Sequence, residues 1–494
     1  MALVLIFDCG ATNLRTIVMD EKGKIIASHH TPNQTKLCPD NKNYHFWDFE
    51  QIWYKLQHCA EKTFIQLQDK GISLSNIKGI SVTTFGVDGA PFDKNGQQLY
   101  PIISWKCPRT LPIMENLSKY LNVKDLYLRN GVGQYSFNTL FKLIWLKENQ
   151  PKIFEKMDKW VFISSMITHR LTGNLTTDRT MAGTSMMTNL NTGDWDNQVL
   201  EVLGLTPNHF PSMYNPGEKV GTLTISLAKK FGLNEIPVFS CGHDTQFAVF
   251  GSGAKKGEAV LSSGTWEILM ARTDKAYPQV DFISDGLTTE LDAENRYFNP
   301  AVQWVGSGVM EWIGKLLFTD VFNTEAYYPT MISEGELAPP GAKGVHLEGC
   351  FAATEDDYCL GKITGLSMHH TRGQIYRAAL EYMALKLKHG LKVLNTVSGL
   401  QPQSLICVGG GSKNMLWNQI RADILNIPID IVDVAESTVL GAAMFTFAGL
   451  GVYPNIEIAQ DAMQPQKKRI VPGINQQDYA KWLTEINKKG KELC

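Results

Sequence analysis

The sequence predicts two α/β domains with a ligand-binding cleft between them, on three observations. The chain has 494 residues, enough for two or three domains of ordinary size. A pattern of apolar strand, turn of small or hydroxyl residues and second apolar strand occurs twice, at residues 4–18 and 259–269. Each copy opens one half of the chain. Two tight turns that face one cleft can both direct backbone N–H groups at the same anion.

The composition is that of an ordinary globular protein. Hydrophobic residues make up 44% of the chain and charged residues 19%. Lys plus Arg is 47 and Asp plus Glu is 49, so the formal net charge is −2. A general nucleic-acid binder needs a basic surface to neutralise phosphates, and this charge balance argues against one.

The cysteines and the apolar segments indicate the cellular compartment of the protein. Its nine cysteines form no C-x-x-C pair and no zinc spacing, which favours a reducing, cytoplasmic compartment. The apolar residues 2–7 lead directly to Asp8 with no basic segment before them, so they predict a strand rather than a signal peptide. Residues 439–453 are interrupted by three glycines and fall short of the roughly 20 residues that span a bilayer, which predicts a buried helix. We expect no membrane partner and leave a homo-oligomer open.

The elements of the first half are predicted from periodicity. Apolar side chains near helical spacing predict a helix over residues 49–68, and the four residues 20–23 predict a turn between two strands. Strands are expected at residues 3–7, 15–19, 24–28 and 77–83, and further helices at residues 138–149 and 164–171.

The second half follows a strand at residues 238–241. Strands are expected at residues 259–261, 266–271 and 404–408, with helices at 372–398 and 416–425. The predicted limits are therefore a first domain at 1–245, a second at 246–450 and a tail at 451–494 that packs on or trails from the second domain. Lys467, Lys468 and Arg469 in the tail are expected to form a solvated surface.

The turn from Asp8 to Arg15 is the first chemical motif. Gly10 permits a tight turn, and the turn's N–H groups with the Thr12 hydroxyl can form an anion-binding nest. Asp8 ends a buried strand beside it, where a carboxylate next to bound phosphates suits Mg²⁺. An ordinary hairpin turn explains these residues equally well.

Two further glycine-containing segments are candidates for nucleotide contacts. Thr265, in the turn 262–266, could offer its hydroxyl and N–H to a phosphate, although Ser/Gly turns are common. Residues 409–411 are three glycines between a strand and a helix, and they would let a nucleotide approach the backbone. The spacing is not that of a P-loop, and a plain strand-to-helix loop is the alternative.

Asp244 lies in a segment, residues 242–248, that follows a strand and opens a helix between the two halves. The helix N-terminus stabilises its ionised form, which a base that accepts a proton at neutral pH requires. Taken alone, the segment predicts only that Asp244 caps the helix.

The loop 84–89 and the segment 104–110 are candidates for binding a polyol. They carry Asp88 and then Trp105, Lys106 and Arg109, which combine a carboxylate, cations and an aromatic face. The alternative is a surface turn and a buried structural ion pair. Together, the two turns, the three glycines and Asp244 occur in the order that ATP-dependent phosphoryl transfer requires.

These motifs also resemble those of a known family. The pattern Asp8-x-Gly-x-Thr-x-x-Arg15, the segment 263–265 and the glycines 409–411 resemble the phosphate and adenosine motifs of the actin-like, Hsp70-like and hexokinase-like ATPase superfamily. Gly361-x-Ile-x-Gly-Leu366, followed after seven residues by Gln374-Ile-x-x-Ala-Ala-Leu-Glu381, resembles the C-terminal signature of the FGGY carbohydrate kinases. The resemblance extends from about residue 1 to about residue 450.

The resemblance implies two actin-like, ribonuclease H-like domains with a cleft between them, ATP and Mg²⁺ as cofactors, and a small ketose as substrate. It implies that Asp244 is the catalytic base and that Asp8 helps to hold Mg²⁺. The other implied site residues are Thr12, Asn13, Arg15 and Thr265 around the phosphates, Gly410, Gly411 and Asn414 at the adenosine, and Gly86, Asp88, Arg109, His243 and Thr245 at the sugar.

Three alternatives stay open at this point. The first concerns the substrate, because kinases of this family act on several different sugars and the chain could use any of them. The second is an actin- or Hsp70-like ATPase that drives a protein partner, which sugar-independent ATP turnover would support. The third is a sugar-binding regulator without catalysis, which the paired phosphate turns disfavour.

Overall fold

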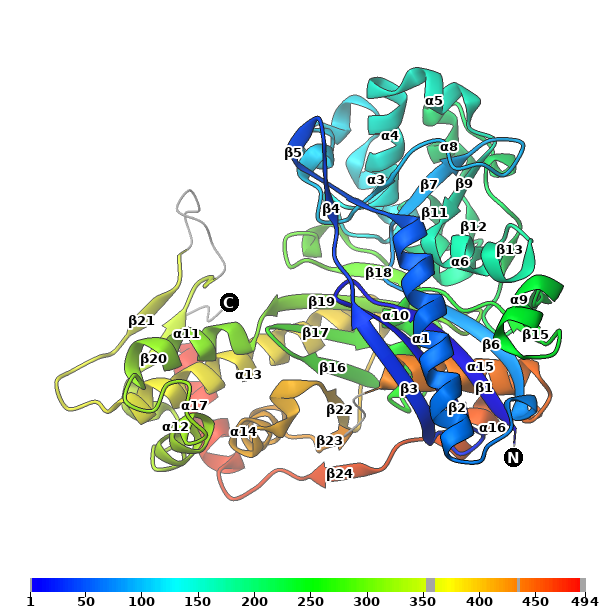
Figure 1. Cartoon of the computed structure of the whole chain (residues 1–494). Coiled ribbons are helices and arrows are strands. Elements are labelled where there is room, and N and C mark those ends of the chain that lie inside the picture. Colours follow the sequence, from blue (N-terminus) through cyan, green and yellow to red (C-terminus); the bar gives the residue numbers. More distant parts are fainter. Residues whose placement is uncertain (1, 352–359, 433–435, 489–494) are drawn as a thin grey trace.

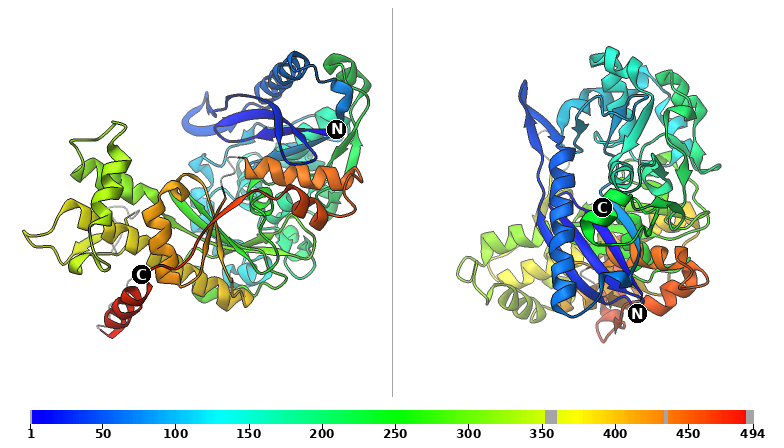
Figure 2. Two further views of the ribbon diagram at one scale, coloured as in Figure 1. Left: turned by 90° about the horizontal axis from the view of Figure 1, so that it is seen from below. Right: turned by 45° about the vertical axis from the view of Figure 1, so that its right-hand side comes forward.

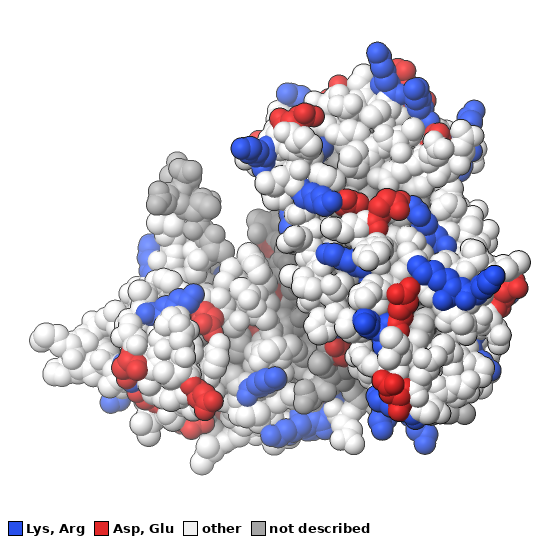
Figure 3. Space-filling view, in the orientation of Figure 1, with Lys and Arg blue, Asp and Glu red and all other residues white. Residues whose placement is uncertain are grey.

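A computed structural model describes residues 2–351, 360–432 and 436–488, and it has two lobes, each built on one large mixed sheet (Figure 1). The prediction of two α/β domains is confirmed. The first sheet combines blue strands with the green strand β15, and the second combines green strands with the gold strands β22 and β23 and the red strand β24. Figure 3 shows basic and acidic side chains interspersed over the face that it presents. Among the described residues, no helix combines the length and the apolar character needed to cross a membrane.

The first sheet has the strand order β14-β15-β6-β1-β2-β3. Its first strand is buried along its whole length, and it pairs antiparallel with β2 and parallel with β6. The opening strand–turn–strand pattern of the sequence is thus the centre of this sheet. The six strands are β1 (Leu3–Cys9), β2 (Asn13–Asp20), β3 (Ile25–Pro32), β6 (Ile77–Thr84), β14 (Lys219–Thr222) and β15 (Pro237–Phe239).

The second sheet has the order β18-β19-β17-β16-β22-β23-β24. Its central strand β16 pairs antiparallel with β17 and parallel with β22, as β1 does with β2 and β6. The strands are β16 (Ala259–Ser263), β17 (Trp266–Ala271), β18 (Thr288–Leu291), β19 (Phe298–Val305), β22 (Leu405–Val408), β23 (Ile429–Val432) and β24 (Lys467–Ile470).

The last strand, β24, comes from the segment expected to be a tail. It pairs antiparallel with β23 at the sheet edge, in the place that β14 has beside β15. Lys467, Lys468 and Arg469 are exposed as expected, but Arg469 also forms an ion pair with Asp430. Beyond it, helix α17 (Gln476–Lys488) buries Tyr479, whose hydroxyl donates to Glu381 at 2.7 Å.

One long helix follows the antiparallel strands of each sheet and packs on it. The spacing of apolar residues predicted both helices, and their observed bounds are close to the expected ones. They are α1 (Phe49–Asp69), which packs on β2 and β3, and α13 (Arg372–Ser398), which packs on β17 and β19.

Two helices, α10 (Asp244–Gly251) and α15 (Ser437–Gly449), lie between the two sheets (Figure 2). They follow corresponding strands, β15 and β23. Val249 of α10 joins the core of the second sheet, whereas Val439 and its neighbours on α15 pack against Val4 of the first. The expected helix over 439–453 is therefore correct in place, but it ends at Gly449 and the chain turns at Gly451, where φ is +73°.

The remaining elements enlarge each lobe around the cleft. Those of the first lobe form its upper part in Figure 1: β4 (Lys36–Cys38), β5 (Asn41–Trp47), β7 (Gly89–Phe92), β8 (Ile102–Ile103), α2 (Leu111–Glu115), α3 (Val123–Asn130), α4 (Thr139–Asn149), α5 (Pro151–Lys156), β9 (Lys159–Phe162), α6 (Ile163–Thr172), β10 (Thr177–Asp178), α7 (Arg179–Gly183), β11 (Thr188–Asn189), β12 (Asp194–Trp195), α8 (Asn197–Leu203), β13 (Met213–Tyr214) and α9 (Ile225–Phe231). Those of the second are α11 (Ser307–Leu317), α12 (Tyr327–Glu336), β20 (His346–Glu348), β21 (Lys362–Thr364) and α14 (Met415–Leu425). Helix α16 (Ile456–Met463) packs on α15, in the core that includes Val4 and Ile6 of the first sheet.

Candidate active site

A cavity of about 260 Å³ opens between the two lobes. Its lining combines apolar side chains with hydroxyl, amide, imidazole and carboxylate groups. Its lining from the first lobe is Phe85, Gly86, Val87, Trp105, Tyr135, Phe137 and Asn138, with His243, Thr245 and Gln246 from the start of α10, and that from the second lobe includes Ile268, Met270, Thr288, Glu290 and Gln303. A cavity of this kind can hold a small polar molecule with an apolar part.

Asp244 stands at the first position of α10, as the sequence predicts. It lines a neighbouring cavity, also of about 260 Å³, together with Ser262 and Thr438. Thr245, Ile268 and Met270 line both cavities, so the Asp244 carboxylate lies beside the passage from one to the other. Burial raises the pKa of Asp244, and the charge of His243 opposes that rise.

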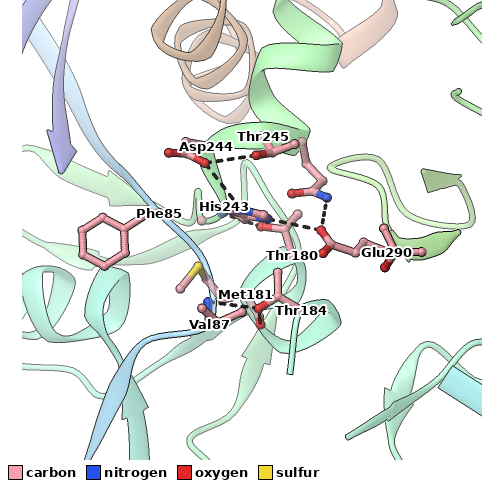
Figure 4. A network of polar contacts seen from close by, with 12 residues as sticks. Phe85, Val87, Thr180, Met181, Thr184, His243, Asp244, Thr245 and Glu290 are labelled. Atoms are coloured by element: carbon pink, nitrogen blue, oxygen red, sulfur yellow. Dashed lines mark hydrogen bonds and ion pairs between the residues drawn. The ribbon is translucent and has the colours of Figure 1, made fainter. Parts of the chain in front are cut away.

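Glu290, on β18, is a site residue that the sequence did not reveal. Its Oε2 lies 3.3 Å from His243 Nδ1 and accepts a hydrogen bond from Gln246 Nε2 at 2.6 Å, while His243 Nε2 lies 3.5 Å from Asp244 Oδ1 (Figure 4). Burial disfavours the charged imidazole, but the carboxylates of Glu290 and Asp244, together with Gln246, outweigh burial and raise the pKa of His243. The imidazole thus connects carboxylates from the two halves of the chain, and no local motif could have indicated that contact.

The first turn carries its charges as an ion-pair chain. Arg15 Nε donates to Asp8 Oδ2 at 2.8 Å, and its Nη1 donates to Glu436 Oε1 at 2.7 Å. Burial raises the pKa of Asp8 to about 6, although the Arg15 guanidinium opposes this. The predicted phosphate ligand Arg15 is therefore held by two carboxylates here, and Glu436, which precedes α15, was not predicted.

The backbone of the first turn has the conformation that the glycine motif predicts. Gly10 N donates to Asn13 O at 2.9 Å, and a Cβ on Gly10 would lie 2.9 Å from that same oxygen, so only glycine closes the turn without displacement. Thr12 and Asn13 are exposed at its tip. Their hydroxyl and amide groups are accessible to a ligand, and their contact with phosphate remains a prediction.

The second turn is built on a buried ion pair. Thr265 is exposed, and its carbonyl accepts a hydrogen bond from Gly306 N at 2.8 Å. Directly behind it, Glu267 pairs with Arg421, and both side chains have no exposed surface. Ser263 Oγ donates to Glu267 Oε1 at 3.0 Å.

The loop with the three glycines 409–411 packs against this second turn. At Gly409 φ is +89° and a Cβ would lie 2.6 Å from Ser263 O, and a Cβ on Gly411 would lie 2.2 Å from Ser263 Oγ. At Gly410 nothing lies within 4 Å of that position, so this glycine leaves open space. Asn414 caps α14 by accepting from Trp417 N at 3.1 Å and donates to Tyr376 at 2.8 Å.

Two predicted sugar ligands need correction, because Asp88 and Arg109 do not line the cavity. Asp88 is fully buried in an ion pair with Lys142, and its other oxygen accepts from Trp47 Nε1 at 2.7 Å and from Trp105 N at 3.0 Å. The alternative prediction of a buried structural ion pair is thus correct for this residue. Its carboxylate oxygens are already used within the protein.

Arg109 is also buried away from the cavity. Its guanidinium lies 4.3 Å from the ring centre of Tyr44 and 4.8 Å from that of Trp145, and Nη1 donates to Tyr100. The sequence placed it in a loop beside Trp105, which does line the cavity, but the chain turns between them. Gly86, His243 and Thr245 line the cavity as expected, and their contacts with a sugar remain predictions.

Two lobes, each built on a mixed sheet with a hairpin at its centre, and the cavities between them define the class of protein: the two-domain α/β fold that solved sugar kinases share. A glycerol kinase from Plasmodium falciparum, solved with ADP, shares this fold with a TM-score of 0.87 at 22% identity, over 100% of this chain and 98% of that one.

The chain belongs to the FGGY family of carbohydrate kinases. The model of the family's N-terminal domain matches residues 3–251, and that of its C-terminal domain matches residues 259–450. An L-fuculokinase from Haemophilus influenzae is 65% identical over 473 residues, which cover 96% of this chain and all of the relative. An L-fuculokinase from Escherichia coli is 43% identical over 471 residues, or 95% of this chain and 97% of the relative.

Proposed function

We propose that this carbohydrate kinase transfers the γ-phosphate of ATP to L-fuculose, giving L-fuculose 1-phosphate in L-fucose degradation. The observation that carries the proposal is the position of Asp244, beside the passage between a cavity suited to a sugar and a cavity beside the second turn. The identity of 65% to a full-length L-fuculokinase supports the choice of sugar. So does the sequence itself, since the segments around Asp88, Trp105, Asp244 and Thr265 resemble those of L-fuculokinases.

Asp244 acts in this proposal as the base that takes the proton from the sugar hydroxyl as the phosphate is transferred. Its place at the first turn of α10 favours the carboxylate form, and the neighbouring His243 opposes the rise in pKa that burial causes. General-base catalysis of this kind contributes about 10²–10⁴-fold to the rate. Gly86, His243 and Thr245 would hold the sugar beside it.

The phosphates would lie between the two turns. Thr12 and Asn13 of the first turn and Thr265 of the second are exposed and offer hydroxyl or amide groups. Arg15 can exchange its bond to Glu436 for one to a phosphate, since both side chains are about a quarter exposed and a ligand at the turn can reach them. Gly410, Gly411 and Asn414 would border the adenosine.

Asp8 fits a Mg²⁺ ion that accompanies the nucleotide. Its carboxylate is buried, and the negative charge of Asp244 is close enough to raise its pKa further, so a cation between them would relieve an unfavourable charge arrangement. Among the described residues no group of three His, Cys, Asp or Glu side chains could enclose a metal. This agrees with a Mg²⁺ that is bound through one or two carboxylates, water and substrate phosphates. When bound, the ion would neutralise charge on the transferring phosphate.

The setting of the reaction is proposed on the same basis. A cytoplasmic location fits the use of ATP and the cysteine pattern. The proposed partners are ATP and a ketose, and a homo-oligomer remains an open alternative. The other candidate functions are a kinase for another ketose, with L-rhamnulose foremost, and an ATPase that drives a protein partner.

The test is ADP release from MgATP by the purified protein, alone and with L-fuculose, L-rhamnulose, D-xylulose, D-ribulose and glycerol in turn. We expect strong stimulation by L-fuculose. Stimulation mainly by another ketose would retain the kinase and replace the substrate. ATP turnover that no sugar changes would favour the partner-driving ATPase.

A further inference from the structure

Val87 has a backbone conformation that β-branched residues rarely adopt. Its φ is +63°, and the amide of Asp88 donates to the carbonyl of Gly86 at 2.8 Å, which closes a three-residue γ-turn around it. A γ-turn with positive φ is rare and strained even for less bulky residues. Such strain persists only where the surroundings enforce it, and it is concentrated at functional sites.

The surroundings of Val87 hold this turn from several directions. The Val87 amide donates to Thr184 Oγ1 at 3.2 Å, and its carbonyl accepts from Thr139 Oγ1 at 2.8 Å and from Lys142 Nζ at 3.1 Å. Lys142 is completely buried and also pairs with Asp88, the last residue of the turn. A buried charge pair is costly unless it is fully satisfied, and here its bonds fix the backbone on both sides of the valine.

The Val87 side chain lines the sugar cavity. The apolar lining residues of the same lobe are Phe85, Trp105 and Phe137. Phe137 is itself positioned by two aromatic contacts. Its ring stacks on that of Tyr135 with the ring centres 5.1 Å apart, and it meets the ring of Trp105 edge to face with the ring centres 6.3 Å apart. A hydrocarbon part of the ligand can pack on these side chains without loss of hydrogen bonds, whereas a hydroxyl group placed there would be buried without a partner.

Val87 and Asp244 lie on opposite sides of His243 (Figure 4). Gly86 is pressed against the imidazole, because a Cβ on it would lie 2.9 Å from His243 Cδ2. A sugar whose reacting hydroxyl lies at Asp244 therefore has its far end near Val87. In L-fuculose the phosphate acceptor is the C1 hydroxyl, and the opposite end of the carbon chain is a methyl group, C6.

We infer that Val87, held in its γ-turn by the Lys142–Asp88 pair, receives the C6 methyl of a 6-deoxyketose and selects that sugar over ketoses with hydrogen or hydroxymethyl at this position. This inference rests on the proposed function and specifies which end of the sugar each side of the cavity binds. A missing methyl group in an apolar pocket lowers kcat/KM about 10–200-fold. A hydroxymethyl group would bury a hydroxyl without a partner, which is also unfavourable.

Three sugars that differ only at this position test the inference. L-fuculose carries the methyl, D-ribulose has hydrogen in its place, and L-tagatose has hydroxymethyl. For the wild-type protein we expect kcat/KM to be highest for L-fuculose, with D-ribulose about 10–200-fold lower. Val87→Gly removes the side chain while its backbone accepts positive φ, so the variant should fold. It should lose about tenfold on L-fuculose and little on D-ribulose.

Val87→Thr provides a second variant that retains the side-chain shape and adds a hydroxyl. It should raise the ratio of kcat/KM for L-tagatose to that for L-fuculose. Val161→Ala is the matched control, because Val161 is a buried valine of the same lobe that does not line the cavity. It should leave all three sugar ratios unchanged, whatever it does to stability.

The outcomes separate the inference from the function on which it rests. An equal loss on L-fuculose and D-ribulose in Val87→Gly would overturn the role of Val87 and leave the kinase assignment intact. A wild-type protein that does not phosphorylate L-fuculose would overturn both. A loss confined to L-fuculose, with the expected change in Val87→Thr, would establish the methyl contact.

Discussion

The two sheets have the same construction but place their charges differently. In both, a central strand pairs with an antiparallel hairpin partner on one side and a parallel strand on the other, and an antiparallel strand closes the edge. In the first, the turn itself carries Asp8 and Arg15. In the second, the turn carries uncharged Ser262 and Thr265, and the charge pair of Glu267 and Arg421 is buried behind it.

This difference indicates that the two copies of the same sheet arrangement have different roles in binding. A partly accessible charge chain can exchange partners when a nucleotide and a cation arrive. A buried pair with no exposed surface cannot, and it makes the second turn a fixed platform. The helices that follow show the same division, because α10 begins with Asp244 and α15, its counterpart, begins with Ser437.

The largest effect, on kcat, is expected from a comparison of substitutions at the first residues of these two helices. Asp244→Asn should lower kcat about 10²–10⁴-fold, because the amide cannot accept the proton, while ATP binding is retained. Ser437→Ala, at the matching position of α15, should change kcat by at most about tenfold, the worth of one neutral hydrogen bond. Steady-state kinetics with L-fuculose and a nucleotide-binding titration measure both. Equal losses in the two variants would remove the distinction between the halves.

The next effect concerns stability, and it compares the two arginines. Arg421→Met leaves Glu267 as an uncompensated buried carboxyl, and we expect the free energy of unfolding to fall by about 3–5 kcal/mol. Arg15→Met also leaves a buried carboxyl, Asp8, without its partner, but Arg15 and Glu436 are each about a quarter exposed, so the cost should be smaller, about 1–3 kcal/mol. Urea unfolding without ligands checks the pair. A larger loss for Arg15→Met would contradict the view that the second turn is the rigid one.

The pH dependence of stability should report the charge in the first turn. The folded pKa of Asp8 is about 6, above the unfolded 3.8, so folding becomes less favourable as pH rises through this range. Relative to wild type, Asp8→Asn should therefore gain up to about 3 kcal/mol in unfolding free energy between pH 4 and pH 7, at roughly 1.36 kcal/mol per pKa unit. The measurement is urea unfolding of both proteins across that range, without nucleotide or Mg²⁺.

A control residue should give the opposite slope in the same experiment. Burial favours the neutral form of Asp196, but the ion pair with Arg129 and the hydrogen bonds from Gln198 and Asn189 together outweigh burial and lower the pKa of Asp196. Asp196→Asn should therefore lose stability relative to wild type as pH rises, mainly below about pH 4, where the unfolded carboxyl titrates, so the unfolding series must extend to that range. A flat difference for Asp8→Asn would show that its carboxyl is not the strained charge of the first turn.

The smallest effect distinguishes the exposed hydroxyls of the two turns. Thr265→Val should raise the KM for ATP by about 2–13-fold, or 0.5–1.5 kcal/mol, because the hydroxyl is exposed to water and the backbone N–H groups of the turn remain, with little change in the KM for sugar. Thr12→Val should have an effect of the same kind and size. An effect of either substitution on the sugar KM alone would place that turn away from the phosphates.

Local signals in the sequence predicted the hairpins and long helices of the two sheets and the residues at the turns. The hairpins, the long helices α1 and α13 and the position of Asp244 all depend on neighbours within a few residues, so periodicity and turn chemistry reveal them. Strand β24 was not expected, because the residues that pair at a sheet edge can be as charged as Lys467 and Lys468.

Contacts between distant segments were beyond the sequence. Glu290 meets His243, Glu436 meets Arg15 and Lys142 meets Asp88 only after the chain has folded. The last of these explains the error at Asp88: a carboxylate in a glycine-rich loop suggests a ligand, whereas an amine buried on α4 determines that it is structural. The positive φ of Val87 was equally hidden, since valine predicts a strand.

The crossing of α10 and α15 limits which sequences this protein can have. A Cβ on Gly251 would lie 1.9 Å from Ser437 O, and one on Gly441 would lie 2.1 Å from Phe247 O, so the two backbones touch directly. No side-chain adjustment relieves an overlap with backbone oxygen. In a library with every residue at every position, these two glycines should be among the least replaceable outside the cleft, although neither contacts a ligand. Substitutions should be tolerated widely on the surface of each lobe, but hardly at all at the crossing of α10 and α15.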